Sequence, residues 1–179
     1  MSISWTCPEC GINYDEITDR DAVLAVRTFP YRYKKALTEL QPGEDMEEIL
    51  RERPAPEVWS AIEYTAHLAQ TLDLMAPTIR QIVNEENPLL YEFDPDKQAE
   101  EQSYNDWAFT QVMSELESAC ADLSSAIEYV DPADWNRKGT FSYGEREAID
   151  VARNAVHEGN HHLMDIERGL AALRGPGRA

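Results

Sequence analysis

The chain has 179 residues, of which 42% are hydrophobic and 28% charged, so it is long and apolar enough for one globular domain with an ordinary core. Its net charge of −18, from 16 basic and 34 acidic side chains, repels phosphate backbones and anionic membranes, which excludes nucleic acid as an expected partner. The apolar runs are too short to span a bilayer, and the N-terminus lacks the basic and apolar regions of a signal peptide. We therefore expect a cytoplasmic protein with no membrane partner.

Apolar residues that recur three and four positions apart predict four long helices. The first spans residues 19–40, where Pro30 is expected to kink the helix or break it in two. The second begins at Ser60, because Ser60 and Glu63 have the spacing of a capping box, in which serine and glutamate satisfy each other's backbone N–H groups. It ends just before Pro88, which cannot continue a helix.

The third helix is predicted over residues 104–130 and the fourth over 142–173, the latter starting at a second capping box formed by Ser142 and Glu145. A short helix is expected over residues 46–51. No stretch shows the alternating pattern of a strand. The expected loops include residues 89–99 and 137–140.

These elements predict an all-α protein, a four-helix bundle in a single domain that spans residues 1–179. We expect a short N-terminal Cys-x-x-Cys segment over residues 1–18 and the bundle itself over residues 19–174. The glycines and the proline near the C-terminus predict a flexible tail over residues 175–179.

Histidines at helical spacing are the most informative feature of the chain. His157 and His161 are four residues apart in the fourth helix and therefore lie on one of its faces, where both can bind the same metal ion. His67 lies in the second helix. Three histidines with one open coordination position suit a catalytic divalent metal, and zinc, nickel and iron fit equally well. The alternative is a solvated polar face that carries two histidines.

The same residues match the His-Glu-x-x-His pattern of zinc peptidases, in which the glutamate, here Glu158, would be the general base. Two features disfavour a peptidase. Gly159 weakens the helix that the motif requires, and little of the chain follows His161 to supply a third ligand. We therefore keep the peptidase as a minor alternative.

Two of the three cysteines, Cys7 and Cys10, form a Cys-x-x-Cys pair without a second such pair to complete a zinc ribbon. This leaves three interpretations: a reduced pair without a role, half of a metal site with ligands from elsewhere in the chain, or a redox pair. The third cysteine, Cys120, is predicted to be a small core residue.

The ordered set of motifs resembles the DinB/YfiT-like superfamily of metal-binding helical bundles. Residues 59–68 look like the second helix of that family, and residues 155–166, which follow Asp134-Trp135 and a basic loop, look like its last helix. The resemblance extends from about residue 19 to residue 172. It implies a four-helix bundle with a divalent metal held by three histidines, at positions that map here to His67, His157 and His161.

Two details of this resemblance concern individual ligand positions. Some relatives carry a glutamate at the position of His157, so the chain is similar to the all-histidine version of the family. His162 matches an adjacent family histidine that is not usually a ligand. Glu158 is a weak candidate for the catalytic base, and water bound to the metal is a better one.

The resemblance implies an enzyme that acts on a small-molecule substrate, either a metal-dependent hydrolase or a thiol S-transferase. In the first case the metal activates water. In the second it holds a low-molecular-weight thiol as the thiolate, and the mycothiol-dependent maleylpyruvate isomerase also uses such a thiol. Four cations near the fourth helix are candidates for binding a thiol's carboxylates, or are ordinary surface charges: Arg137, Lys138, Arg146 and Arg153.

A hypothesis of a different class is a non-catalytic bundle that binds a metal or a small ligand, or only dimerises. The sequence leaves the oligomeric state open, and a homodimer is one option because bundles of this type often pair. The sequence does not choose between these functions.

Overall fold

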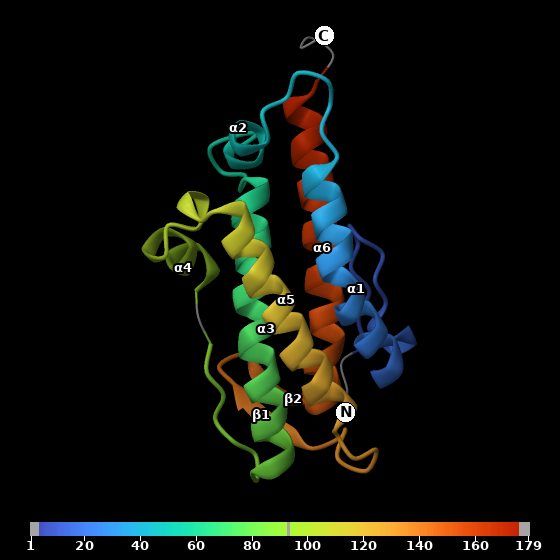
Figure 1. The fold of residues 1–179 in the computed structure, drawn as a ribbon. Helices are drawn as coiled ribbons and strands as arrows, with labels where there is room; N and C mark the ends of the chain where they lie inside the picture. Colours follow the sequence, from blue (N-terminus) through green and yellow to red (C-terminus); the bar gives the residue numbers. More distant parts are fainter. Residues whose placement is uncertain (1–3, 93, 176–179) are drawn as a thin grey trace.

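A computed structural model describes residues 4–92 and 94–175, so most of the predicted C-terminal tail lies outside the described residues. Four long helices lie side by side (Figure 1): α1 (Asp19–Thr38), α3 (Ala61–Asn84), α5 (Phe109–Glu128) and α6 (Ala148–Leu173). The helices α5 and α6 each contact both α1 and α3, so the order around the bundle is α1, α5, α3, α6. This confirms the predicted all-α bundle.

The direction of the helices explains the connections between them. Figure 1 shows α1 and α6 running one way and α3 and α5 the other. Because α3 and α5 are parallel, the chain must return along the bundle between them. The return segment contains α4 (Pro95–Glu101) and a 3₁₀ helix (Tyr104–Asp106), and α2 (Met46–Arg51) connects α1 with α3 as predicted.

The predicted loop over residues 89–99 is therefore partly wrong, since α4 begins inside it. The side chain of Asp94 accepts hydrogen bonds from the backbone N–H groups of Asp96 and Lys97, and Pro95 occupies the first turn. An aspartate cap followed by proline is a helix-start signal that the sequence does contain.

The start of the fourth helix also differs from the prediction. Residues Lys138–Phe141 form β1 and residues Gly144–Glu147 form β2, an antiparallel hairpin, and α6 begins only after it. Ser142 lies in the two-residue turn of the hairpin, and Gly144 has a φ of +117°, which disfavours a side chain. The capping box of α6 is formed by Glu147 and Asp150 rather than by Ser142 and Glu145.

Pro30 does not break α1, which remains one helix, so of the two predicted outcomes, a kink or a break, the break is wrong. Proline inside a helix costs about 3 kcal/mol because one hydrogen bond is lost. The residues on either side of it, Val26, Phe29 and Tyr33, are fully buried. Burial contributes roughly 1.5–3 kcal/mol for each large apolar side chain, which offsets that cost.

The predicted capping box at the start of α3 is confirmed. Ser60 accepts a hydrogen bond from the N–H of Glu63, and the Glu63 carboxylate accepts one from the N–H of Ser60. Glu63 is 3% exposed and also accepts a hydrogen bond from Arg53 at 2.8 Å. Burial raises the pKa of Glu63, but Arg53 and Ser60 outweigh it, so the pKa is lowered and the carboxylate stays charged. These contacts fix the start of α3, and His67 follows one turn after Glu63.

The helices α1 and α6 approach each other closely at Gly159. A Cβ atom built on Gly159 would overlap the aromatic ring of Phe29. The hydroxyl of Tyr33, fully buried on α1, donates a hydrogen bond to the carbonyl of Gly159 at 2.9 Å. This contact fixes both the distance between the helices and the rotation of α6 about its axis.

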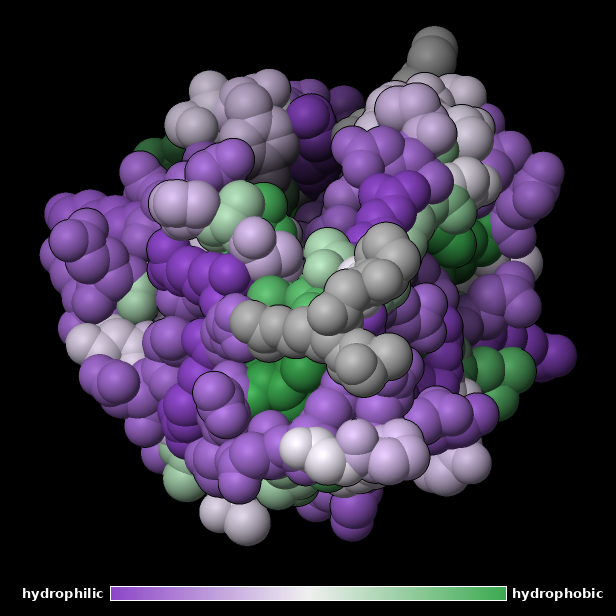
Figure 2. All heavy atoms as spheres, turned by 90° about the horizontal axis from the view of Figure 1, so that it is seen from above, coloured by the Kyte–Doolittle hydropathy of each residue, from purple (hydrophilic) through white to green (hydrophobic). Residues whose placement is uncertain are grey.

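Polar residues dominate the surface at the end of the bundle where α6 ends (Figure 2). The high acidic content agrees with this view. Among residues 4–92 and 94–175, no helix has the length and apolar character needed to cross a membrane.

We predict that Gly159→Ala lowers the free energy of unfolding by about 1–3 kcal/mol, because the added methyl group overpacks against Phe29. Alanine is the better helix former by roughly 1 kcal/mol, so helix propensity alone predicts the opposite sign. Urea denaturation followed by circular dichroism measures the effect. Gly169→Ala in the same helix is the control, since its Cβ meets only Pro54 Cγ at 3.2 Å. A Gly159→Ala protein as stable as wild type would contradict the prediction.

Candidate metal centres

Two pairs of potential ligands lie on α6, offset by one residue. One pair is His157 and His161, and the other is Glu158 and His162. One residue corresponds to about 100° of rotation, so the two pairs face different directions. Each pair is completed by residues from elsewhere, and within each group the potential ligand atoms all lie within 4.8 Å of one another. We call His67, Glu158 and His162 the pocket cluster, and Cys7, Cys10, His157 and His161 the cysteine–histidine cluster.

The three histidines that the sequence assigns to one metal therefore lie in two groups. His67 meets Glu158 and His162, whereas His157 and His161 meet the cysteine pair. The physical reason is the rotation of α6, which periodicity alone does not fix. The Glu-x-x-x-His spacing of Glu158 and His162 was the sequence signal for the second pair.

The pocket cluster brings two imidazoles to one carboxylate. Glu158 Oε2 lies 3.1 Å from His162 Nε2 and 3.9 Å from His67 Nε2. The other ring nitrogen of His162 lies 3.1 Å from Asp165 Oδ2, which holds the ring with Nε2 toward Glu158. His67 is 6% exposed, and Thr71 Oγ1 lies 3.5 Å from its Nε2. Two ring nitrogens and one carboxylate oxygen thus converge from α3 and α6.

The pKa values of these three groups differ strongly. Burial, and then the charge of His162, lower the pKa of His67 to about 4. Burial also penalises the charged form of Glu158, but contacts with His157 and His162 outweigh it, so the pKa of this carboxyl is well below its usual range. Burial likewise opposes protonation of His162, yet Asp165 and Glu158 raise its pKa to about 9. At neutral pH without a metal, the cluster holds a neutral His67, an ionised Glu158 and a protonated His162.

A cavity of about 480 Å³ adjoins this cluster, and His67 and Glu158 both line it. Its wall includes aromatic side chains from three parts of the chain, Tyr14, Tyr91 and Phe141. Arg146 is the only lysine or arginine among the described residues that line it, and its guanidinium lies 4.7 Å from the centre of the Tyr143 ring. The described lining of the cavity thus combines an apolar, aromatic wall with one cation and three carboxylates, those of Glu92, Asp150 and Glu158.

The other three candidate cations have structural contacts. Arg137 donates hydrogen bonds to the carbonyls of Ile82 and Glu85 at the end of α3. Lys138 pairs with Glu145 at 2.8 Å across the hairpin, and Arg153 donates to the carbonyl of Ile17 at 3.0 Å. These contacts favour a structural role for the three side chains.

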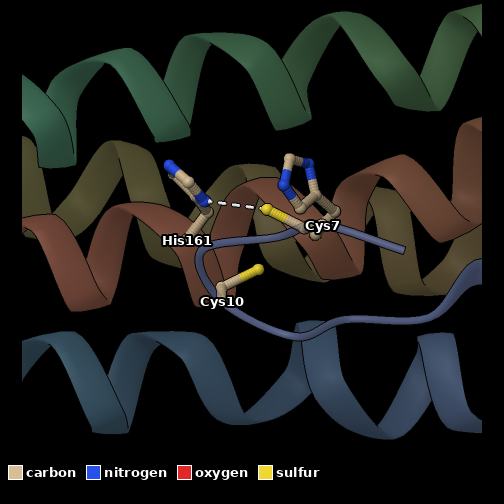
Figure 3. Close-up of side chains that lie close together, drawn as sticks. Cys7, Cys10 and His161 are labelled. Atoms are coloured by element: carbon tan, nitrogen blue, oxygen red, sulfur yellow. Dashed lines mark hydrogen bonds between the residues drawn. The ribbon is translucent and has the colours of Figure 1, made fainter. Parts of the chain in front are cut away.

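The cysteine–histidine cluster lies where the N-terminal segment meets α6 (Figure 3). Cys7 Sγ lies 3.6 Å from His161 Nδ1, and both Cys7 and Cys10 are free thiols. Burial opposes ionisation of Cys7, but the backbone N–H groups of Cys10 and Glu9, together with His157, lower its pKa to about 6. Cys120 is 2% exposed, and burial raises its pKa to about 12, as expected for a core residue.

We predict that NMR titration of the metal-free protein finds the His67 ring titrating near pH 4 and the His162 ring near pH 9. The pKa of His162 is raised above the unfolded value of about 6.5, so its contribution to stability is complete below about pH 6.5 and is lost as the pH rises to 9. His162→Gln assigns the signal. If both rings titrate near pH 6.5, the cluster is not assembled as described.

Comparison with known proteins identifies other proteins with this fold. A model of the DinB superfamily matches residues 28–166. Among solved structures, YfiT from Bacillus subtilis, described as a probable metal-dependent hydrolase with an unusual four-helix bundle topology, has a TM-score of 0.76 at 12% identity, over 92% of this chain and 91% of that chain. A mycothiol-dependent maleylpyruvate isomerase has a TM-score of 0.67 at 14% identity, over 86% of this chain and 62% of that chain.

A conserved protein from Enterococcus faecalis is also similar, with a TM-score of 0.64 at 11% identity, over 88% of this chain and 98% of that chain. At these identities the likeness shows the fold alone. No curated protein sequence matches significantly. Because the family model covers most of the sequence, this chain belongs to the DinB superfamily.

Proposed function

We propose that this protein is a metal-dependent enzyme that acts on a small molecule in the cavity, with His67, Glu158 and His162 as the metal ligands. The observation that carries the proposal is the convergence of two imidazoles and one carboxylate at the wall of a 480 Å³ cavity. Two histidines and one carboxylate are a known ligand set of catalytic zinc, and they also bind iron in sites with open positions.

The chemistry of the donors fits a divalent cation. His67 is neutral at physiological pH and Glu158 is ionised, which are the protonation states that bind metals. His162 is protonated without a metal and would release one proton as the ion binds. Asp165 orients His162, as carboxylates commonly do for metal-binding imidazoles. A divalent ion held there would lower the pKa of a bound water or thiol and so supply a nucleophile at neutral pH.

The residues around the cavity support one class of substrate. The aromatic and aliphatic wall, from Tyr14, Met75 and Phe141 among others, binds an apolar or aromatic body. Arg146 supplies one positive charge for one anionic group of the substrate. We therefore propose a small carboxylate or phosphate with an apolar part as the substrate.

Hydrolysis is the leading reaction class because the His–His–carboxylate set is that of zinc hydrolases. Thiol transfer is the second candidate, and its support is the similarity of fold to the mycothiol-dependent isomerase. A single lining cation gives little support for a thiol that carries several carboxylates. Peptidase chemistry is also poorly supported, because His157 and His161 lie with the cysteines and Glu158 contacts His162.

We predict that His67→Ala removes one metal ion per chain and lowers turnover by at least about 100-fold, because a catalytic metal needs each of its few protein ligands. Elemental analysis of the gel-filtered protein measures the metal, and a panel of esters, amides and phosphoesters, with and without added thiols, measures turnover. Asp73→Ala is the matched control, since Asp73 is an exposed residue of the same helix. Turnover that requires a thiol would favour the transferase over the hydrolase.

The enzyme proposal fails if His67→Ala and His162→Ala retain all of the metal found in wild type. It also fails if metal-loaded wild type turns over no member of the panel in either condition. The non-catalytic metal-binding bundle would then be the better account.

A further inference from the structure

Cys7 and Cys10 face α6 from a turn of the N-terminal segment, and hydrogen bonds within the backbone of that segment hold the turn in place. The N–H of Gly11 donates to the carbonyl of Cys7 at 3.0 Å, and the N–H of Cys7 donates to the carbonyl of Ile12 at 2.9 Å. Gly11 has a φ of +73°, a conformation that suits glycine and disfavours side chains. The backbone therefore holds the two sulfur atoms on one side of the turn (Figure 3).

The four donors have the spacing and the separation of a tetrahedral metal site. Cys7-x-x-Cys10 and His157-x-x-x-His161 match the Cys-x₂-Cys and His-x₃-His spacings of structural zinc sites. Metal–ligand distances of about 2.0–2.3 Å place neighbouring ligand atoms of a tetrahedron roughly 3.3–3.8 Å apart. Cys7 Sγ and His161 Nδ1 are 3.6 Å apart, and all four donors lie within 4.8 Å of one another. The set is therefore close to binding distance.

The surroundings of the two imidazoles support the same site. Asp165 Oδ2 lies 3.6 Å from His161 Nε2, on the ring nitrogen that does not face Cys7. Glu158 Oε1 lies 3.6 Å from His157 Nδ1, and both ring nitrogens of His157 are buried without a hydrogen-bond partner among the described residues. A buried imidazole without a partner is costly, and a metal ion would supply the missing partner.

We propose that Cys7, Cys10, His157 and His161 bind a structural zinc ion, separate from the metal of the pocket cluster. Two thiolates and two imidazoles favour zinc over magnesium, calcium or manganese, which prefer oxygen ligands. Four protein ligands complete a tetrahedral site and leave no open position, which is typical of a structural rather than a catalytic zinc.

The zinc ion would hold the N-terminal segment against α6 and thereby complete one wall of the cavity. The ring of Trp5 lies 5.0 Å from that of His157, and the hydroxyl of Tyr14 donates to Asn154 Oδ1 at 2.7 Å. Tyr14 is also a lining residue of the cavity. Arg168 also pairs with Glu9 at 3.2 Å, and Arg153 donates to the carbonyl of Ile17 at 3.0 Å. A metal that joins Cys7 and Cys10 to α6 would add to these contacts and fix where Tyr14 lies.

The test uses the full-length protein loaded with zinc and freed of unbound ion by gel filtration. Zinc per chain is measured for wild type, Cys10→Ser, His67→Ala and the control Cys120→Ala, whose cysteine is buried in α5. We expect Cys10→Ser to lose one zinc per chain and Cys120→Ala to lose none. We also expect His67→Ala to retain the zinc of the cysteine–histidine cluster, because His67 belongs to the other group.

Three further measurements are made on wild type, and only the cobalt spectrum is also compared with Cys10→Ser. Thiol titration of the native protein is expected to detect Cys7 and Cys10 only after a chelator is added. Cobalt replacing zinc is expected to show thiolate-to-metal charge-transfer absorption, which Cys10→Ser weakens. Amide hydrogen exchange over residues 5–17 is expected to accelerate after chelation while α3 and α5 stay protected.

The proposal is overturned if Cys10→Ser binds as much zinc as wild type and the thiols react equally with and without the chelator. It is also overturned if the purified protein holds a disulfide between Cys7 and Cys10 that zinc cannot replace after reduction. Neither result bears on the pocket metal, whose loss in His67→Ala is measured separately.

Discussion

The contact between Gly159 and the ring of Phe29 sets how α6 is rotated in the bundle, and both groups of candidate metal ligands depend on that rotation. With Gly159 against α1, Glu158 and His162 lie roughly 60–100° around the helix, on the side where α6 contacts α3. His157 and His161 lie roughly 160–200° from Gly159, on the outer face of α6. One helix thus presents Glu158 to the cavity with His162 beside it, and His157 and His161 to the N-terminal segment. Figure 3 shows His161 beside the two cysteines of that segment.

Two carboxylates connect the pocket cluster with the cysteine–histidine cluster. Glu158 places one oxygen 3.1 Å from His162 and the other 3.6 Å from His157. Asp165 Oδ2 lies 3.1 Å from His162 Nδ1 and 3.6 Å from His161 Nε2. Under our proposals, Asp165 orients a histidine of each metal site, and Glu158 binds one metal while it contacts a ligand of the other. The catalytic and structural sites would therefore lie on the same helix and be influenced by the same two carboxylates.

The sequence predicts the bundle because its signals are local. Apolar periodicity places the four long helices, and the Ser60–Glu63 capping box fixes the start of α3. Apolar periodicity does not predict the shorter elements. Strands of four residues show no clear alternation, so the sequence pattern does not indicate the hairpin and favours a helix cap at Ser142. The sequence does not predict how the candidate ligands divide into two groups, for a different reason. Which of two adjacent pairs on α6 faces α3 depends on packing against Phe29, a residue about 130 positions away in the sequence.

The measurement that tests this account most directly is anomalous diffraction from crystals of the metal-loaded protein, recorded at the absorption edges of zinc, nickel and iron. The account predicts two metal peaks per chain, with zinc in the cysteine–histidine cluster and a second ion in the pocket cluster. A single peak bound by His67, His157 and His161, with both cysteines unliganded, would contradict it.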